Sequence, residues 1–265
     1  MVALIVAAVV TIWPRPIAHR AATLEISTID VGQGDSLLVI TPHGKTLLID
    51  AGGIVGANGP NAADPSAHAT NFDVGDDVVS PVLWSRGIRR LDAVAITHAH
   101  ADHIGGMGAV LANFRPRELW IGINPHSVLY DSVLAEAKAT GTCVIRHTAG
   151  DIFTFDNVSI RVLAPELNYH PAATPGNNDS LVLQMRFGST TALLEGDAES
   201  PSEDRMVAEE MCIRDSSGAM SATIENGGAP STDRPTQKMT FEEVPDASGS
   251  SGSTVTAVSY THLAT

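Results

Sequence analysis

Four side chains that commonly bind metal ions lie within six consecutive residues of this sequence: His98, His100, Asp102 and His103. They follow a short apolar and β-branched segment, LDAVAIT, of the kind that forms a buried strand. Because side chains alternate along an extended chain, His98 and His100 leave the strand end on the same side. A turn at Ala101 lets the next two side chains fold back toward a neighbouring position. Imidazole and carboxylate ligands together suit zinc, manganese or iron rather than calcium, which favours a transition-metal site over a polar loop with chance histidines.

This cluster resembles the His-x-His-x-Asp-His signature of the metallo-β-lactamase superfamily. Three flanking segments narrow the resemblance to the hydrolase-like domain of ComEC-type DNA-internalisation competence proteins: IDVGQGDSLLVI at 29–40, TLLIDAGG at 46–53 and NNDSLVLQMRFGSTTALLEGDAE at 177–199. The motifs occur in the family's order, and the resemblance covers about residues 24–208. It implies an α/β fold, the metallo-β-lactamase-like αββα sandwich, here incomplete at its C-terminal end.

The resemblance also implies how the ligands divide between two metal positions. In the superfamily, an aspartate at the position of Asp197 bridges two ions. His98 and His100 would complete one position, and Asp102 and His103 would complete the other. Asp102 would in addition position the attacking hydroxide, which makes it the predicted catalytic residue.

Other polar residues are predicted to support the ligands or to bind substrate. Asp50, at a strand end, is expected to orient a ligand histidine. The backbone amides of the turn between Asp30 and Asp35 are expected to face a phosphate, although a simple hairpin turn fits nearly as well. Asn178 and Ser180 stand where many relatives have a histidine, so they either bind substrate oxygens or cap the following strand.

The charge of the chain works against non-specific attraction to DNA. There are 16 basic and 30 acidic residues, and the net charge is -14. If the protein acts on DNA, bound metal ions or a local basic patch must supply the attraction. The candidates for such a patch, which fit an ordinary solvated surface equally well, are Arg86, Arg89, Arg90, Arg115 and Arg117.

Hydrophobic periodicity predicts strands that first form a meander and then alternate with helices, as two packed sheets between helical layers require. The helix at 127–141 begins with Ser127 as its N-cap and stops at Gly141. Cys143 is predicted to be a small buried residue, and neither it nor Cys212 is assigned a disulfide partner. The predicted strands are 24–31, 36–42, 45–52, 92–98, 118–122, 143–148, 157–165, 180–188 and 190–197, and the other helices are 78–87 and 106–114.

Both ends of the chain differ in composition from the predicted metallo-β-lactamase-like domain at 21–210. Residues 1–20 begin with thirteen apolar residues, too few to span a bilayer, and the resemblance implies the remnant of a transmembrane segment. Residues 211–265 are expected to be a disordered or artefactual tail, because they are rich in Ser, Gly and Thr and contain MCIRDS and VSYTHL, which resemble translated sequencing adapters. The family's later His-His-Gly-Ser motif does not occur in the sequence. We therefore expect weak or absent hydrolase activity from this chain.

Three functions are compatible with these observations. The resemblance implies phosphodiester cleavage of incoming DNA with one or two zinc or manganese ions. It also implies attachment to a membrane channel, on the extracytoplasmic side of a bacterial membrane. The same metal site would suit a hydrolase of thioesters, lactones or lactams. The third function is a non-catalytic module of the channel, which metal content would separate from the two enzymes, whereas a panel of substrates would separate the enzymes from each other.

Overall fold

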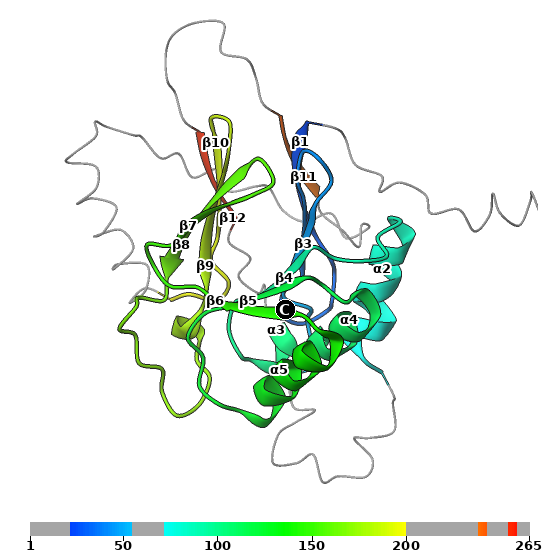
Figure 1. Ribbon diagram of the computed structural model, residues 1–265, viewed down its shortest axis with the longest axis vertical. Coiled ribbons are helices and arrows are strands. Elements are labelled where there is room, and N and C mark those ends of the chain that lie inside the picture. The colour runs from blue at the N-terminus through cyan, green and yellow to red at the C-terminus, as the bar shows by residue number, and fades with distance from the viewer. Residues whose placement is uncertain (1–21, 55–71, 200–237, 243–253, 259–265) are drawn as a thin grey trace, which may run out of the picture.

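Two β-sheets lie face to face in the computed structural model, which describes residues 22–54, 72–199, 238–242 and 254–258 (Figure 1). The larger sheet has seven strands in the order β11-β1-β2-β3-β4-β5-β6, and the smaller has five in the order β12-β10-β9-β8-β7. The strands of the larger sheet are β1 Thr23–Thr28, β2 Leu37–Ile40, β3 Thr46–Ile49, β4 Ala93–Ile96, β5 Glu118–Ile121, β6 Cys143–Arg146 and β11 Lys238–Glu242. Those of the smaller sheet are β7 Ile152–Phe155, β8 Val158–Ala164, β9 Val182–Phe187, β10 Thr190–Leu194 and β12 Thr254–Val258.

The order of strands in the larger sheet follows from its connections. β1, β2 and β3 form the predicted antiparallel meander, while β3, β4, β5 and β6 run parallel to one another. Parallel neighbours need crossover connections, which the helices supply. The helical elements are the π-helical turn η1 Gly75–Val79, α2 Ser80–Ser85, α3 Ala101–Ile104, α4 Met107–Phe114, α5 Val128–Thr140 and the 3-10 turn η2 Asn177–Asp179.

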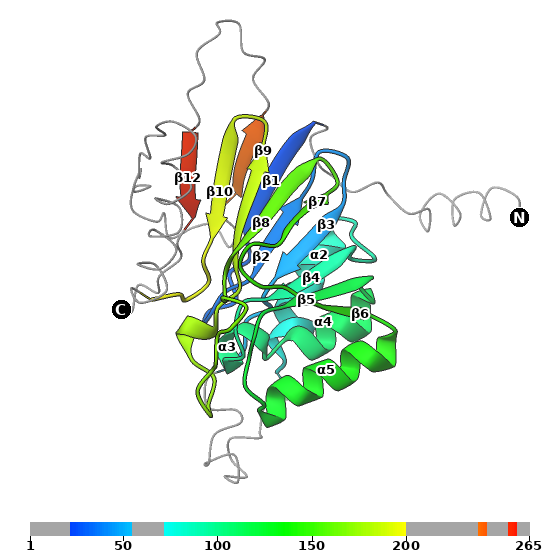
Figure 2. The same ribbon diagram turned by 60° about the vertical axis from the view of Figure 1, so that its left-hand side comes forward.

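Each face of the larger sheet is buried against a different layer. Val94 and Ile96 of β4 pack with the helices, whereas Ala93 and Ala95 pack in the core between the sheets. Such a strand is apolar on both faces, which is why it reads as a continuous apolar run. Figure 2 shows α2, α4 and α5 on the side of the larger sheet that faces away from the smaller sheet. Within the described residues, no α-helix covers the outer face of the smaller sheet.

Several predicted boundaries are confirmed. The Ser127 hydroxyl accepts a hydrogen bond from the Tyr130 amide at 3.1 Å, which caps α5. Gly141 ends α5 in the left-handed conformation, with φ +77°. The predicted helix after the two glycines corresponds to α4, and the cluster HADHI contains an additional short helix, α3.

Two predictions about the edge of the sandwich are wrong. The structure contains a strand, β7, that the predicted list omits, and it pairs with β8 through the two-residue turn Asp156–Asn157. Cys143 is exposed rather than buried, because β6 is the last strand of its sheet in the described chain and none of its four residues is buried.

The expected tail needs a correction over ten of its residues. β11 pairs antiparallel with β1, and β12 pairs parallel with β10, so these two segments belong to the sheets. Their sequences, KMTFE and TVTAV, contain the β-branched and aromatic residues that suit strands, and β1 and β10 offer edges to pair with. The rest of 211–265, like the predicted membrane remnant at 1–20, lies outside the described residues. In the part of the chain that the structure describes, no helix is long and apolar enough to cross a bilayer.

Candidate metal centre

The predicted ligands gather at the carboxyl end of β4, where two other segments meet it. Asp50 follows β3, the histidine cluster follows β4, and Asp197 follows β10 of the other sheet. The Leu181 amide donates a hydrogen bond to the Thr97 carbonyl at 2.8 Å, which fastens the start of β9 to the end of β4. The two sheets therefore converge where the histidines begin.

His98, His103 and Asp197 form the tightest group of metal-capable atoms in the described chain. One ligand atom from each lies within 4.8 Å of the others, and both histidines are fully buried. His103 Nε2 is 3.3 Å from Asp197 Oδ2, but it has no hydrogen-bond partner of good geometry. A buried nitrogen in this condition fits a metal ligand whose metal would complete its coordination.

His100 contacts His98, a member of this group. Its Nδ1 lies 2.8 Å from His98 Nε2, and its Nε2 lies 3.0 Å from the Pro175 carbonyl oxygen. The carbonyl can only accept, so His100 Nε2 carries the proton and Nδ1 keeps its lone pair. The predicted division, in which His98 and His100 share one metal position, Asp102 and His103 share the other and Asp197 bridges both, stays a prediction.

Asp50 contacts the end of β4 and the ring of His103, as expected for a residue that orients a ligand histidine. Its carboxylate accepts hydrogen bonds from the Thr97 amide at 2.9 Å, from the Thr97 hydroxyl and from His103 Nδ1 at 2.8 Å. All three groups are buried, and Asp50 itself has an unusual φ of +57°. A non-glycine residue in this conformation costs about 1–3 kcal/mol, which the surrounding hydrogen bonds must offset.

Thr97 was not singled out from the sequence, yet it connects both buried histidines to Asp50. Its hydroxyl donates to Asp50 Oδ2, and its oxygen then faces His98 Nδ1 at 3.2 Å. His98 Nε2 and His100 Nδ1 lie within hydrogen-bond distance, at 2.8 Å, so one of the two nitrogens carries the proton between them in the metal-free protein. Both nitrogens can bind a metal ion once that proton is lost, so the donor set fits a transition-metal ion.

The pKa values of the two buried histidines, His98 and His103, also fit a metal site. Burial lowers the pKa of His98, and the neighbouring His103 and His100 lower it further, to about 3. Burial also acts to lower the pKa of His103, but its interactions with Asp197 and Asp50 outweigh burial and raise the pKa to about 11. At neutral pH His98 is therefore neutral, and a proton sits on His103 where a metal ion would take its place.

A glycine sets the distance between Asp197 and the histidines. Gly196 has φ +56°, and a Cβ built on it would lie 2.8 Å from the Cβ of Thr97. We expect Gly196→Ala to lower the free energy of unfolding by about 1–3 kcal/mol and to weaken metal binding, because Thr97 must move. Thermal denaturation and metal titration measure both effects. Gly108→Ala in α4 is the matched control: its Cβ meets nothing within 4 Å, so stability should stay equal or rise.

The remaining predicted residues lie around this group without all contacting it. Asp102 is half-buried on α3, and its carboxylate has no hydrogen bond or ion pair within the described residues. The turn at 30–35 packs on the same helix, since a Cβ on Gly34 would lie 1.7 Å from the Asp102 carbonyl oxygen. Asp30 accepts the Gly32 amide at 3.1 Å, so at least this amide of the turn is already used. The backbone oxygen of Asp35 accepts the Gly52 amide at 3.0 Å.

Asn178 and Ser180 make local contacts. The Ser180 hydroxyl donates to the Asn177 carbonyl at 2.7 Å, which is the capping alternative for this residue. Asn178 accepts the Glu199 amide at 3.3 Å, and its amide donates to the Glu199 carboxylate at 3.4 Å. This pair joins the segment before β9 to the segment that carries Asp197. Glu199 had no recognisable signal in the sequence, because its partner is 21 residues away.

The five candidate arginines are not at the metal centre. Arg89 and Arg90 precede β4, and Arg115 and Arg117 precede β5, whereas the histidines follow the other end of β4. Since β4 and β5 run parallel, these four arginines lie at the opposite end of the strands from the histidines. Three of the five side chains are engaged locally: Arg86 with Glu25 at 2.9 Å, Arg90 with the Arg115 carbonyl at 3.2 Å, and Arg117 with Asp92 at 3.9 Å.

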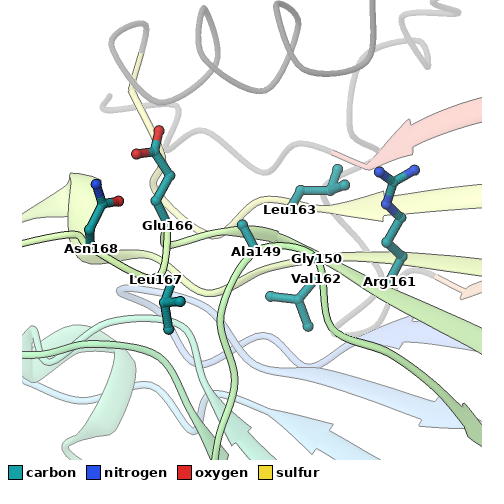
Figure 3. A pocket seen from close by; sticks show the side chains of 8 residues that line it. All are labelled: Ala149, Gly150, Arg161, Val162, Leu163, Glu166, Leu167 and Asn168. Atoms are coloured by element: carbon teal, nitrogen blue, oxygen red, sulfur yellow. The ribbon is translucent and has the colours of Figure 1, made fainter. Parts of the chain in front are cut away.

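A pocket of about 320 Å³ lies beside the turn after β6 and the end of β8 (Figure 3). None of the predicted site residues lines it. In Figure 3, Arg161, Leu163 and Glu166 point to one side of the ribbon, and Val162 and Leu167 point to the other. The pocket is therefore separate from the metal centre.

Comparison with known proteins identifies the family. The family model of the Metallo-beta-lactamase superfamily matches residues 29–223. The chain is 34% identical over 186 residues to ComE operon protein 3 of Bacillus subtilis (strain 168), a match that covers 69% of this chain and 23% of that protein. It is 26% identical over 204 residues to Competence protein ComA of Neisseria gonorrhoeae, covering 77% of this chain and 24% of that one. The chain thus spans less than a quarter of the length of these relatives.

One of the similar solved structures has low sequence identity to this chain. The metallo-beta-lactamase fold protein YhfI from Bacillus subtilis has 18% identity and a TM-score of 0.38, over 65% of this chain and 62% of that one. The family is shown by the family model over residues 29–223 and by the 34% identity to ComE operon protein 3. The chain therefore belongs to the metallo-β-lactamase superfamily, as a hydrolase-type domain related to the competence proteins.

Proposed function

We propose that this domain hydrolyses phosphodiester bonds of DNA with one or two divalent transition-metal ions, zinc or manganese. The observation that carries the proposal is the convergence of His98, His103 and Asp197, with His100 against His98, at one buried position. The relation to competence proteins supports DNA as the substrate. We also propose that the parent protein lies in the bacterial membrane, that its channel portion adjoins this domain and that the domain is on the extracytoplasmic side.

The residues of the site have three proposed roles: metal binding, support of a ligand and orientation of the attacking water. A divalent ion at this position would lower the pKa of a bound water and offset the charge that develops on the phosphate. His98, His100, His103 and Asp197 would hold the ions, and Asp50 keeps the His103 ring in place. The Asp102 carboxylate, with no partner in the described chain, is the group to orient the attacking water and accept its proton.

The charge of the site also bears on how DNA would bind. The chain carries -14 overall, and four of the candidate arginines lie at the far end of β4 and β5. Metal ions would therefore provide the main attraction for a phosphate as well as the chemistry. This makes DNA binding, and not only cleavage, dependent on metal.

A substrate panel tests the proposal. Because we expect slow turnover, excess protein is incubated with single-stranded DNA, double-stranded DNA, a thioester, a lactone and a lactam, with Mn²⁺ or Zn²⁺. We expect DNA cleavage, and we expect its rate to fall by at least about a hundredfold after chelation or in Asp197→Ala. Substitution of a residue that only hydrogen-bonds to a metal ligand already lowers metal affinity or activity by about 10–100-fold. Asp131→Ala is the control, because this half-exposed carboxylate lies on α5 and, among the described residues, pairs only with His126.

The possible outcomes separate the three functions. Cleavage of a thioester, lactone or lactam in place of DNA would replace the proposed substrate and keep the enzyme class. A protein that binds no transition metal and hydrolyses none of these substrates, even when extended by its natural flanking sequence, would favour the non-catalytic module.

A further inference from the structure

The segment between β8 and β9 is fastened by one buried carboxylate. Asp179 is 1% exposed, and its Oδ1 accepts the Tyr169 hydroxyl at 2.7 Å. Its Oδ2 accepts the Gly176 amide at 2.8 Å, while its own amide donates to the Gly176 carbonyl at 3.0 Å. A buried charge costs free energy unless it is hydrogen-bonded, and here both oxygens are used.

The same peptide group that Asp179 holds also holds His100. The Gly176 N–H and the Pro175 carbonyl belong to one planar peptide unit. Its N–H donates to Asp179 Oδ2, and its oxygen accepts from His100 Nε2 at 3.0 Å. Because the unit is planar, fixing its N–H fixes the direction of its carbonyl. Hydrogen bonds in such a chain also polarise one another.

We infer that Asp179 is a positioning residue for His100, acting through the Pro175–Gly176 peptide, and that Tyr169 supports it. The carbonyl places the proton on His100 Nε2 and turns the Nδ1 lone pair toward His98 Nε2, 2.8 Å away. Neither Asp179 nor Tyr169 touches the metal-capable atoms. The inference rests on the proposed function only in taking His100 as a metal ligand.

A purely local role for Asp179 is the competing explanation, since its carboxylate also caps the η2 turn. A cap alone would change stability and leave the tautomer of His100 unchanged. The decisive measurement is therefore the ¹⁵N spectrum of metal-free protein labelled at histidine, in which the His100 signals are those missing from His100→Gln. Zn²⁺ affinity by chelator competition is the second measurement.

We expect His100 in the wild type to carry its proton on Nε2. Asp179→Ala should mix the two tautomers and weaken Zn²⁺ binding by about 10–100-fold, as loss of support behind a metal ligand does. Asp179→Asn should recover part of both, because its amide can still accept from Gly176 N–H and donate to the Tyr169 oxygen. Tyr169→Phe should weaken binding by about two- to tenfold, the value of one net hydrogen bond.

Tyr130→Phe is the matched control, because its hydroxyl lies on α5, away from the His100 contacts, and we expect no change in tautomer or affinity. The inference is overturned if folded Asp179→Ala keeps both the wild-type tautomer and the wild-type affinity. If Asp179→Ala does not fold, an unchanged tautomer and affinity in Tyr169→Phe overturn it. DNA cleavage enters neither measurement, so failure of the proposed substrate leaves this result standing.

Discussion

The double variant His98→Ala, His100→Ala is expected to purify without bound transition metal. His98 Nε2 and His100 Nδ1 lie 2.8 Å apart, and His98 also belongs to the group with His103 and Asp197. The variant therefore removes one ligand of that group together with the neighbouring ligand His100. Loss of a supporting residue already costs about 10–100-fold in metal affinity, and loss of two ligands should exceed a hundredfold. Elemental analysis of the purified protein and Zn²⁺ titration measure the effect.

The control for this variant is His43→Ala, His126→Ala. Both histidine side chains are largely exposed, and each pairs with an aspartate away from the metal centre, His43 with Asp156 and His126 with Asp131. This control should keep the wild-type metal content. Equal metal content in the site variant and the wild type would show that the four residues at 98–103 do not form the metal centre.

Asp50→Ala is expected to lower the free energy of unfolding by about 3–5 kcal/mol, the usual cost of breaking a buried ionic pair by removing one partner. The substitution leaves the Thr97 amide, the Thr97 hydroxyl and His103 Nδ1 without their acceptor, and all of these are buried. It also frees the His103 ring, so metal affinity should fall together with stability. Chemical denaturation and Zn²⁺ titration of the same samples test both parts.

Two further variants show which property of Asp50 matters. Asp50→Asn keeps the shape and tolerates the positive φ, so it should fall between wild type and Asp50→Ala. Asp92→Ala removes another carboxylate that accepts a backbone amide, that of Thr46 at 3.0 Å, at the opposite end of β4. It should reduce stability and leave metal affinity unchanged. A loss of metal affinity in Asp92→Ala equal to that in Asp50→Ala would mean that general destabilisation, and not the contact with His103, controls the site.

Local patterns in the sequence were sufficient for much of the fold. The strand that ends in the histidine cluster, the helix α4 and the two ends of α5 all depend on hydrophobic periodicity, on a capping serine or on a glycine stop, which act over a few residues. The motifs also identified the family, as the matches to the superfamily and to the competence proteins confirm. β7 was missed although the Asp156–Asn157 turn marks its hairpin, because a four-residue strand carries little periodicity.

Exposure at sheet edges could not be predicted in the same way. Cys143 lies in an apolar run that resembles a buried strand, but its exposure depends on whether another strand pairs with β6. The position of the arginines likewise depends on strand direction, which puts Arg89 and Arg117 at the end of the strands opposite the histidines. The two short strands β11 and β12 depend on free edges at β1 and β10, a property of the assembled sheets and not of their own sequences.

For the candidate site, the sequence by itself determined which donors are present and that His98, His100, Asp102 and His103 leave one strand end together. Their spacing is local, so a single turn of chain is enough to bring them near one another. Only the tertiary structure decided the partners: His103 with Asp197, His100 with the Pro175 carbonyl 75 residues away, and Asp50 with both Thr97 and His103. Such contacts join two sheets and four loop segments, and their geometry follows from how the sheets pack, which no local pattern of residues encodes.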